Sequence, residues 1–141
     1  MGLTQWPCFT GICAAFLMAS AAAAQAEEVA IELNATTNGN AACTLTFMVT
    51  NGHSVAIDQL IYETVLFDAE GQVDRLTLFD FGALPVGTPR VRQFAVPDLP
   101  CDQLSRVLFN GLHTCTAEGL DAETCGNGMI PTSRTEIEVL G

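Results

Sequence analysis

The stretch from Cys43 to Val73 constrains the fold of this chain more than any other. Apolar residues alternate with mostly threonine from Cys43 to Thr50, and this period of two is typical of a half-buried β-strand. The pair Asn51–Gly52 tolerates positive φ and ends the segment. A second apolar segment runs from Ile57 to Asp68, and Asp68–Gly71 then suits a type I turn in a bulged hairpin. The stretch therefore predicts two core strands and the first hairpin of a β domain.

Two of the expected strands have an unusual pattern. Ile57–Asp68 is apolar on both faces, which predicts either a central strand with both faces partly covered or a strand whose phase is shifted by a bulge. The apolar positions from Leu76 to Phe81 break phase between Leu78 and Phe79, so we expect a kinked strand there. Further strands are expected at Val29–Asn34, Val91–Val96, Arg106–Asn110 and Thr135–Val139.

About seven short strands at regular spacing, with no long helical period, predict an all-β fold. A single immunoglobulin-like antiparallel β-sandwich fits best, and a small closed barrel is the alternative. Residues 36–42 are expected to turn. The segment from Thr114 to Ser133 is rich in glycine and is expected to be a loop, in which Asp121 is placed to cap one helical turn through Cys125.

The first 26 residues have the features of an export signal. Phe9 to Ala24 is a mostly apolar run that is too short to span a bilayer comfortably, and Ala24-Gln25-Ala26 is a small-x-small cleavage pattern. We therefore expect residues 1–26 to be a signal peptide and residues 27–141 to form one domain in the periplasm or outside the cell. The residues before the apolar run include no Lys or Arg, so the choice between the Sec and Tat routes stays open.

The charge of the chain argues against two classes of partner. Sixteen acidic residues stand against five basic ones, all arginine, for a formal net charge of −11. Such a surface repels phosphates and anionic lipid head groups, so we expect neither nucleic-acid binding nor membrane insertion after signal cleavage.

The cysteines indicate an oxidising compartment. Loss of the signal peptide leaves Cys43, Cys101, Cys115 and Cys125, an even number that predicts two disulfides among three possible connectivities. In the sandwich, Cys43 begins the second strand and Cys101 precedes the sixth, and these strands run the same way in opposite sheets. Their starts lie at one end of the sandwich, so we favour Cys43–Cys101, with Cys115–Cys125 closing the glycine-rich loop.

Several positions between residues 43 and 97 resemble a known bacterial pattern. They are Phe47-x-Val49-x-Asn51, Ile57, Leu60, Phe67-Asp68-x-x-Gly71-x-Val73, Leu84-Pro85-x-Gly87 and Phe94-x-Val96-Pro97. The pattern resembles small exported immunoglobulin-like domains of the FxLYD type, and secreted alphaproteobacterial proteins that are labelled by a Tat signal sequence. The resemblance lies in turn and core positions. It implies the sandwich fold and a role in interaction or envelope assembly, with a protein of the cell envelope as the expected partner, and it brings no catalytic residues.

Candidate catalytic groups are few. The two histidines are His53 and His113, the sequence contains no Gly-x-Ser-x-Gly motif, and bridging of the four cysteines would leave no thiol. His53 lies in a turn that contains Gly and Ser, where we expect an exposed side chain. We therefore expect a protein that is not an enzyme and needs no cofactor.

A metal site is the alternative function. His113, Cys115, Cys125 and Met129 form a soft-ligand set that suits copper or zinc. This alternative, a periplasmic metal-binding protein, requires that the two cysteines are not bonded to each other.

Two further pairs are candidates for binding a protein partner. Met129 and Ile130 lie in the glycine-rich loop, where they are expected either to be exposed on a pre-ordered loop or to cover the core as a lid. Arg90 and Arg92 share one face of a strand and are candidates for contacts with an acidic partner, or for pairing with acids of this chain.

Overall fold

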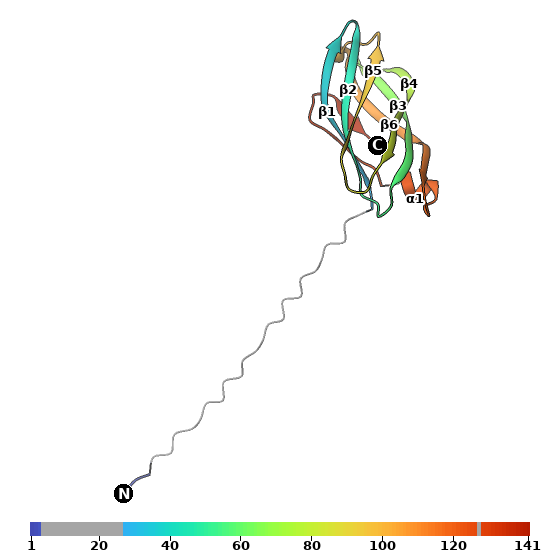
Figure 1. Cartoon of the computed structure of the whole chain (residues 1–141). Coiled ribbons are helices and arrows are strands. Elements are labelled where there is room, and N and C mark those ends of the chain that lie inside the picture. Colours follow the sequence, from blue (N-terminus) through green and yellow to red (C-terminus); the bar gives the residue numbers. More distant parts are fainter. Residues whose placement is uncertain (4–26, 127) are drawn as a thin grey trace.

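A computed structural model describes residues 1–3, 27–126 and 128–141, so most of the expected signal peptide lies outside the described residues. Two four-stranded sheets pack as a sandwich (Figure 1). Sheet A has the order β5 (Arg90–Pro97), β2 (Ala42–Asn51), β1 (Val29–Gly39) and β7 (Ile130–Ser133). Sheet B has the order β4 (Val73–Leu84), β3 (Ile57–Asp68), β6 (Leu104–Ala117) and β8 (Glu138–Leu140). Two short helices, η1 (Cys101–Gln103) and α1 (Ala122–Gly126), complete the fold. The predicted β-sandwich is confirmed.

The core forms between the sheets because the inward positions of both are apolar. Burial alternates strictly along β2, and Phe47 at its centre is fully buried. Four other phenylalanines place their ring centroids 5.9 to 6.0 Å from that of Phe47; they are Phe79, Phe81, Phe94 and Phe109. These rings come from β4, β5 and β6, so the cluster joins the two sheets.

The hairpin between β3 and β4 has the predicted turn. The Gly71 N–H donates to the Asp68 carbonyl at 3.0 Å, and Gly71 has a φ of +80°. The Asp68 carboxylate also accepts the backbone N–H groups of Glu70 and Gln72. The turn expected at residues 36–42 is shorter than predicted. Because Ala41 adopts a φ of +54°, β1 continues to Gly39 and the chain reverses over Asn40–Ala41.

The C-terminal segment forms two strands where one was expected. β7 lies at the end of the segment Thr114–Ser133 that was expected to be a loop, and β6 extends into the start of that segment, to Ala117. β7 pairs in parallel with β1, and β8 pairs in parallel with β6, so the sandwich has eight strands and is not purely antiparallel. The predicted strand at residues 135–139 is interrupted. The reason is local: Ser133 Oγ accepts the Thr135 N–H and Thr135 Oγ1 accepts the Ile137 N–H, which replaces strand pairing with side-chain bonds. The chain crosses from sheet A to sheet B at this bend.

β4 alternates regularly from Arg75 to Phe81, so the expected kink at Leu78–Phe79 was wrong; the phase changes later, at Gly82, which has a φ of +66°. Phe79 and Phe81 point into the core, whereas Leu76 and Leu78 lie on the opposite face and are 62% and 49% exposed. The kink followed from assigning all four apolar side chains to the core. β3 lies between β4 and β6, as the first of the two alternatives predicted. Its pairing with both neighbours also contains register shifts, as the second alternative predicted. Both strands therefore carry apolar residues on the outer face of sheet B.

Candidate functional site

Two disulfides tie the sandwich together. They are Cys43–Cys101 and Cys115–Cys125, the two pairings that we favoured. The first joins the start of β2 in sheet A to η1, directly before β6 in sheet B. The second joins β6 to α1 and holds this helix at one end of the sandwich (Figure 1).

Asp121 caps α1 as the sequence predicted. Its carboxylate accepts the backbone N–H of Thr124 at 2.7 Å and the Thr124 hydroxyl at 3.0 Å. These hydrogen bonds, the backbone bond first, lower the pKa of Asp121. The N-terminus of this single helical turn is therefore satisfied locally.

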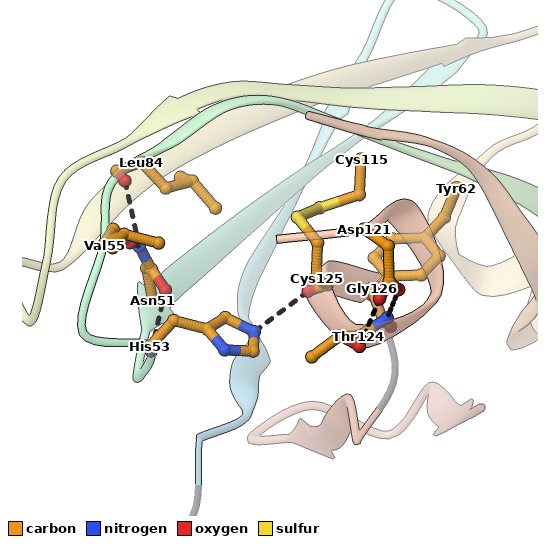
Figure 2. The surroundings of a disulfide bond; sticks show 10 residues. All are labelled: Asn51, His53, Val55, Tyr62, Leu84, Cys115, Asp121, Thr124, Cys125 and Gly126. Atoms are coloured by element: carbon orange, nitrogen blue, oxygen red, sulfur yellow. Dashed lines mark hydrogen bonds between the residues drawn. A yellow bond between two sulfur atoms is a disulfide. The ribbon is translucent and has the colours of Figure 1, made fainter. Parts of the chain in front are cut away.

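Two buried side chains hold the other end of α1 (Figure 2). The His53 Nε2 lies 2.9 Å from the Cys125 carbonyl oxygen, and the Tyr62 hydroxyl donates to the Gly126 carbonyl at 2.9 Å. A carbonyl oxygen only accepts, so the Nε2 atom carries the proton in this bond. The last carbonyls of a helix have no partner within it. Here the body of the sandwich supplies those partners.

His53 is buried, with 1% of its surface exposed, so the expectation of an exposed loop histidine was wrong. Asn51 explains the difference: its side chain accepts the His53 N–H and donates to the carbonyls of Val55 and Leu84. These bonds close the loop and direct the imidazole inward. The Nδ1 atom of the ring is buried and has no hydrogen-bond partner among the described residues. His53 is a structural contact between the β2–β3 loop and α1.

Replacing His53 with alanine is expected to lower the free energy of unfolding by about 1–3 kcal/mol, because the buried Cys125 carbonyl loses its donor. Unfolding in urea measures the change. The matched control is His113→Ala, which removes the same side chain from an exposed position and is expected to change little. Equal effects of the two substitutions would contradict the role given to His53.

The ionisation of Tyr62 provides a second local test. Burial raises the pKa of Tyr62 to about 12, from 10.0 for a free phenol. The stability that comes from the neutral phenol is complete below about pH 10 and is lost as the pH rises through about 12. The chain has one tyrosine, so near-ultraviolet phenolate absorbance reports it directly. A midpoint near 10 in the folded protein would contradict this burial, and a return to about 10 is expected in urea.

The candidate metal ligands do not form a metal-binding set. Cys115 and Cys125 are bonded to each other, so neither sulfur is a thiolate. His113 is exposed on β6, at a register shift where pairing with β3 passes from Leu112 to Thr114. Across residues 27–126 and 128–141, no three His, Cys, Asp or Glu side chains are grouped to hold a metal ion. No cofactor site is assigned to them.

Met129 and Ile130 have different surroundings. Met129 is partly buried and packs against the core, which matches the lid that we considered. Ile130 is 46% exposed at the start of β7, beside Ala30 on the outer face of sheet A. A shallow pocket of about 490 Å³ is lined there by Ile130, Ala30 and Thr50, among others. Ile130 is thus the accessible member of the pair.

Arg92 holds the two sheets together at their side. Its Nε donates to the Phe81 carbonyl at 2.7 Å and its Nη2 to the Ala83 carbonyl at 3.0 Å. Arg75 makes the reciprocal contact from β4, donating to the carbonyl of Pro97 at 2.8 Å. β4 and β5 are the edge strands of opposite sheets, so the two arginines also occupy carbonyls that an added strand would use. The guanidinium of Arg92 is therefore already engaged, whereas Arg90 makes one bond, at 3.3 Å, to the neighbouring Pro89 carbonyl.

Apolar side chains cross the outer face of sheet B in a continuous row. Val65 of β3 pairs with Leu76 of β4 and with Leu108 of β6, and Leu108 pairs with Leu140 of β8. Directly paired residues lie on the same face of a sheet. Val65 is outside the buried cluster between the sheets, but only 7% of its surface is exposed, so the accessible ends of the row are Leu76 and Leu140. We call Leu76, Val65, Leu108 and Leu140 the outer row.

Neighbouring positions widen this apolar surface. Phe67 is two residues from Val65 on the same face of β3, and it pairs with the exposed Val73 of β4. Leu78 is two residues from Leu76 on β4. No element among the described residues packs on this face. Sequence reasoning did not select these residues, although the two apolar faces of Ile57–Asp68 were a signal of them.

The fold and its disulfides define a class: the protein is a disulfide-bonded β-sandwich. No family model matches the sequence, and no curated protein matches it. Among solved structures it is similar to IrmA from Escherichia coli, with a TM-score of 0.53 and 14% identity over 73% of this chain and 89% of that one. At this identity the similarity supports the fold alone. No helix in the described part of the chain is long and apolar enough to span a membrane.

Proposed function

We propose that this protein is a non-catalytic binding module that works outside the cytoplasm and binds another protein through the outer face of sheet B. The observation that carries the proposal is the outer row together with Leu78. Exposed leucines lie at both ends of this row, around the buried Val65, and large exposed apolar patches on soluble proteins mark sites of interaction. Leu76 and Leu78 are 62% and 49% exposed on an edge strand whose other face fills the core.

The two disulfides support a location outside the cytoplasm. Two disulfides suggest an oxidising, extracytoplasmic environment, because thiols in the cytoplasm are kept reduced. The signal peptide expected at residues 1–26 and the resemblance to small exported immunoglobulin-like domains support the same location. These observations together favour a protein that is periplasmic or secreted.

The non-catalytic role is supported by the state of the groups that most often do chemistry. His53 bonds to a backbone carbonyl, His113 is exposed at a register shift, and all four cysteines beyond residue 26 are bridged. None of these side chains forms a nucleophile–base pair in the described residues. We therefore assign the outer face of sheet B a role in binding rather than in catalysis.

Two matched double variants test the proposal. Leu76→Ser with Leu78→Ser removes apolar contact area from sheet B, and Val91→Ser with Ile130→Ser removes similar exposed area from sheet A. The wild-type protein, isolated natively from cells that produce it, is expected to elute from size exclusion in a complex with a second protein. The sheet B variant is expected to elute as the free chain, and the sheet A variant is expected to keep the complex. Free wild-type protein, or loss of the complex only in the sheet A variant, would overturn the proposal.

A further inference from the structure

We infer that the partner of the outer face of sheet B is a protein that surrounds apolar residues with cationic side chains. This inference rests on the function proposed above and identifies the chemistry of the partner. Its basis is the charge of the side chains around the outer row and the arrangement of the arginines.

Acidic side chains flank the apolar row on the same face. Glu63 on β3 pairs with Leu78, Asp80 follows two residues after Leu78 on β4, and Glu138 precedes Leu140 by two residues on β8. Glu63 accepts a hydrogen bond from the Asn110 side chain, and Asp80 accepts one from the Gly82 N–H. These donors are neutral, so they bring no positive charge to either carboxylate.

The arginines leave little of this charge compensated. Arg106 lies on the outer face, where its Nε is 2.6 Å from a Glu138 oxygen and its guanidinium lies 5.5 Å from the centre of the Phe67 ring. Arg75 and Arg92 donate to backbone carbonyls at the side of the sandwich. Arg134 pairs with Glu32 of sheet A at 3.1 Å. Glu63 and Asp80 therefore have no cation beside them among the described ion pairs.

A second copy of this chain does not match such a face. A two-fold interface places the same patch of each copy against the other, so each copy would bring the acids Glu63, Asp80 and Glu138 but a single arginine, Arg106. Like charges across an interface oppose association, and the net charge of −11 adds long-range repulsion. A cationic partner gains attraction from the same acids and still covers the leucines.

Short synthetic peptides test the inference on the purified protein. One peptide alternates leucine and lysine; its controls alternate leucine with glutamate, to reverse the charge, and serine with lysine, to remove the apolar residues. In NMR titrations we expect the leucine–lysine peptide to shift the resonances of Leu76, Leu78 and Leu140, and the controls to leave them in place. Neutralising Glu63→Gln with Asp80→Asn is expected to weaken this binding about tenfold. Glu118→Gln with Glu123→Gln removes the same charge away from the face and should leave the affinity unchanged.

Three results would overturn the inference. The first is equal binding of the leucine–glutamate peptide, and the second is unchanged affinity in the Glu63→Gln, Asp80→Asn variant. The third is sedimentation of the protein as a dimer that Leu76→Ser disrupts, because a second copy would then be the occupant. The proposed function fails separately. If the native complex survives Leu76→Ser with Leu78→Ser, then both the function and the inference that rests on it are rejected; if only the peptide preference is reversed, the binding face stands.

Discussion

Replacing Phe47 with alanine is expected to lower the free energy of unfolding by about 3–5 kcal/mol, enough to remove a large part of the stability of a domain of this size. Phe47 is fully buried, and four aromatic rings from three strands surround it at 5.9 to 6.0 Å. Its removal leaves a cavity between the sheets and also ends four aromatic contacts. Chemical denaturation monitored by circular dichroism measures the loss.

The control for this substitution comes from the outer row. Leu76→Ala also truncates a large apolar side chain, but Leu76 is 62% exposed, so the change is expected to stay below about 1 kcal/mol. Comparable losses in the two variants would mean that Leu76 is covered in the folded chain. That outcome would contradict both the position of the core and the exposed face of sheet B.

Removing the Cys43–Cys101 disulfide is expected to cost about 4 kcal/mol. The bond joins residues separated by 58 positions, and closing a loop of that length removes much conformational entropy from the unfolded chain. The variant is Cys43→Ala with Cys101→Ala, and its free energy of unfolding is compared with that of the wild type under oxidising conditions.

The second disulfide provides the matched comparison. Cys115 and Cys125 are separated by 10 positions, so loss of this bond is expected to cost about 3 kcal/mol. The effect should be largest around α1, since the helix is attached to β6 through Cys125. A greater loss from the shorter link would contradict the account in which each disulfide stabilises the fold according to the length of the loop that it closes.

Local patterns predicted much of the fold. The alternation of Cys43 to Thr50 is sufficient to place β2, since a half-buried strand leaves a period of two in the sequence. The turn at Asp68–Gly71 and the cap at Asp121 were also predicted, because each is made by side chains and backbone within a few residues. Predicting the two disulfide pairs required only the expected order of strands in the two sheets.

The errors occurred where distant contacts decide the structure. Asn51 directs His53 inward while its own side chain bonds to the Leu84 carbonyl, and the imidazole then meets the carbonyl of Cys125, 72 residues away; no local pattern reports these distant partners. Leu76 and Leu78 were assigned to the core because they are apolar, although alternation with Phe79 and Phe81 places them outside. β7 forms in the expected loop because β1, about 100 residues earlier in the chain, pairs with it. The candidate site was missed for the same reason, since the outer row exists only once four strands are paired.

Photo-crosslinking in cells that produce the protein is the measurement that tests the binding face most directly. A photoreactive amino acid is placed at Leu76 on sheet B, and in a separate variant at Val91, which is similarly exposed on sheet A. We expect a defined protein adduct from position 76 and none from position 91. Adducts from position 91 alone, or no protein adduct from either position, would contradict the assignment of the outer face of sheet B as the docking surface.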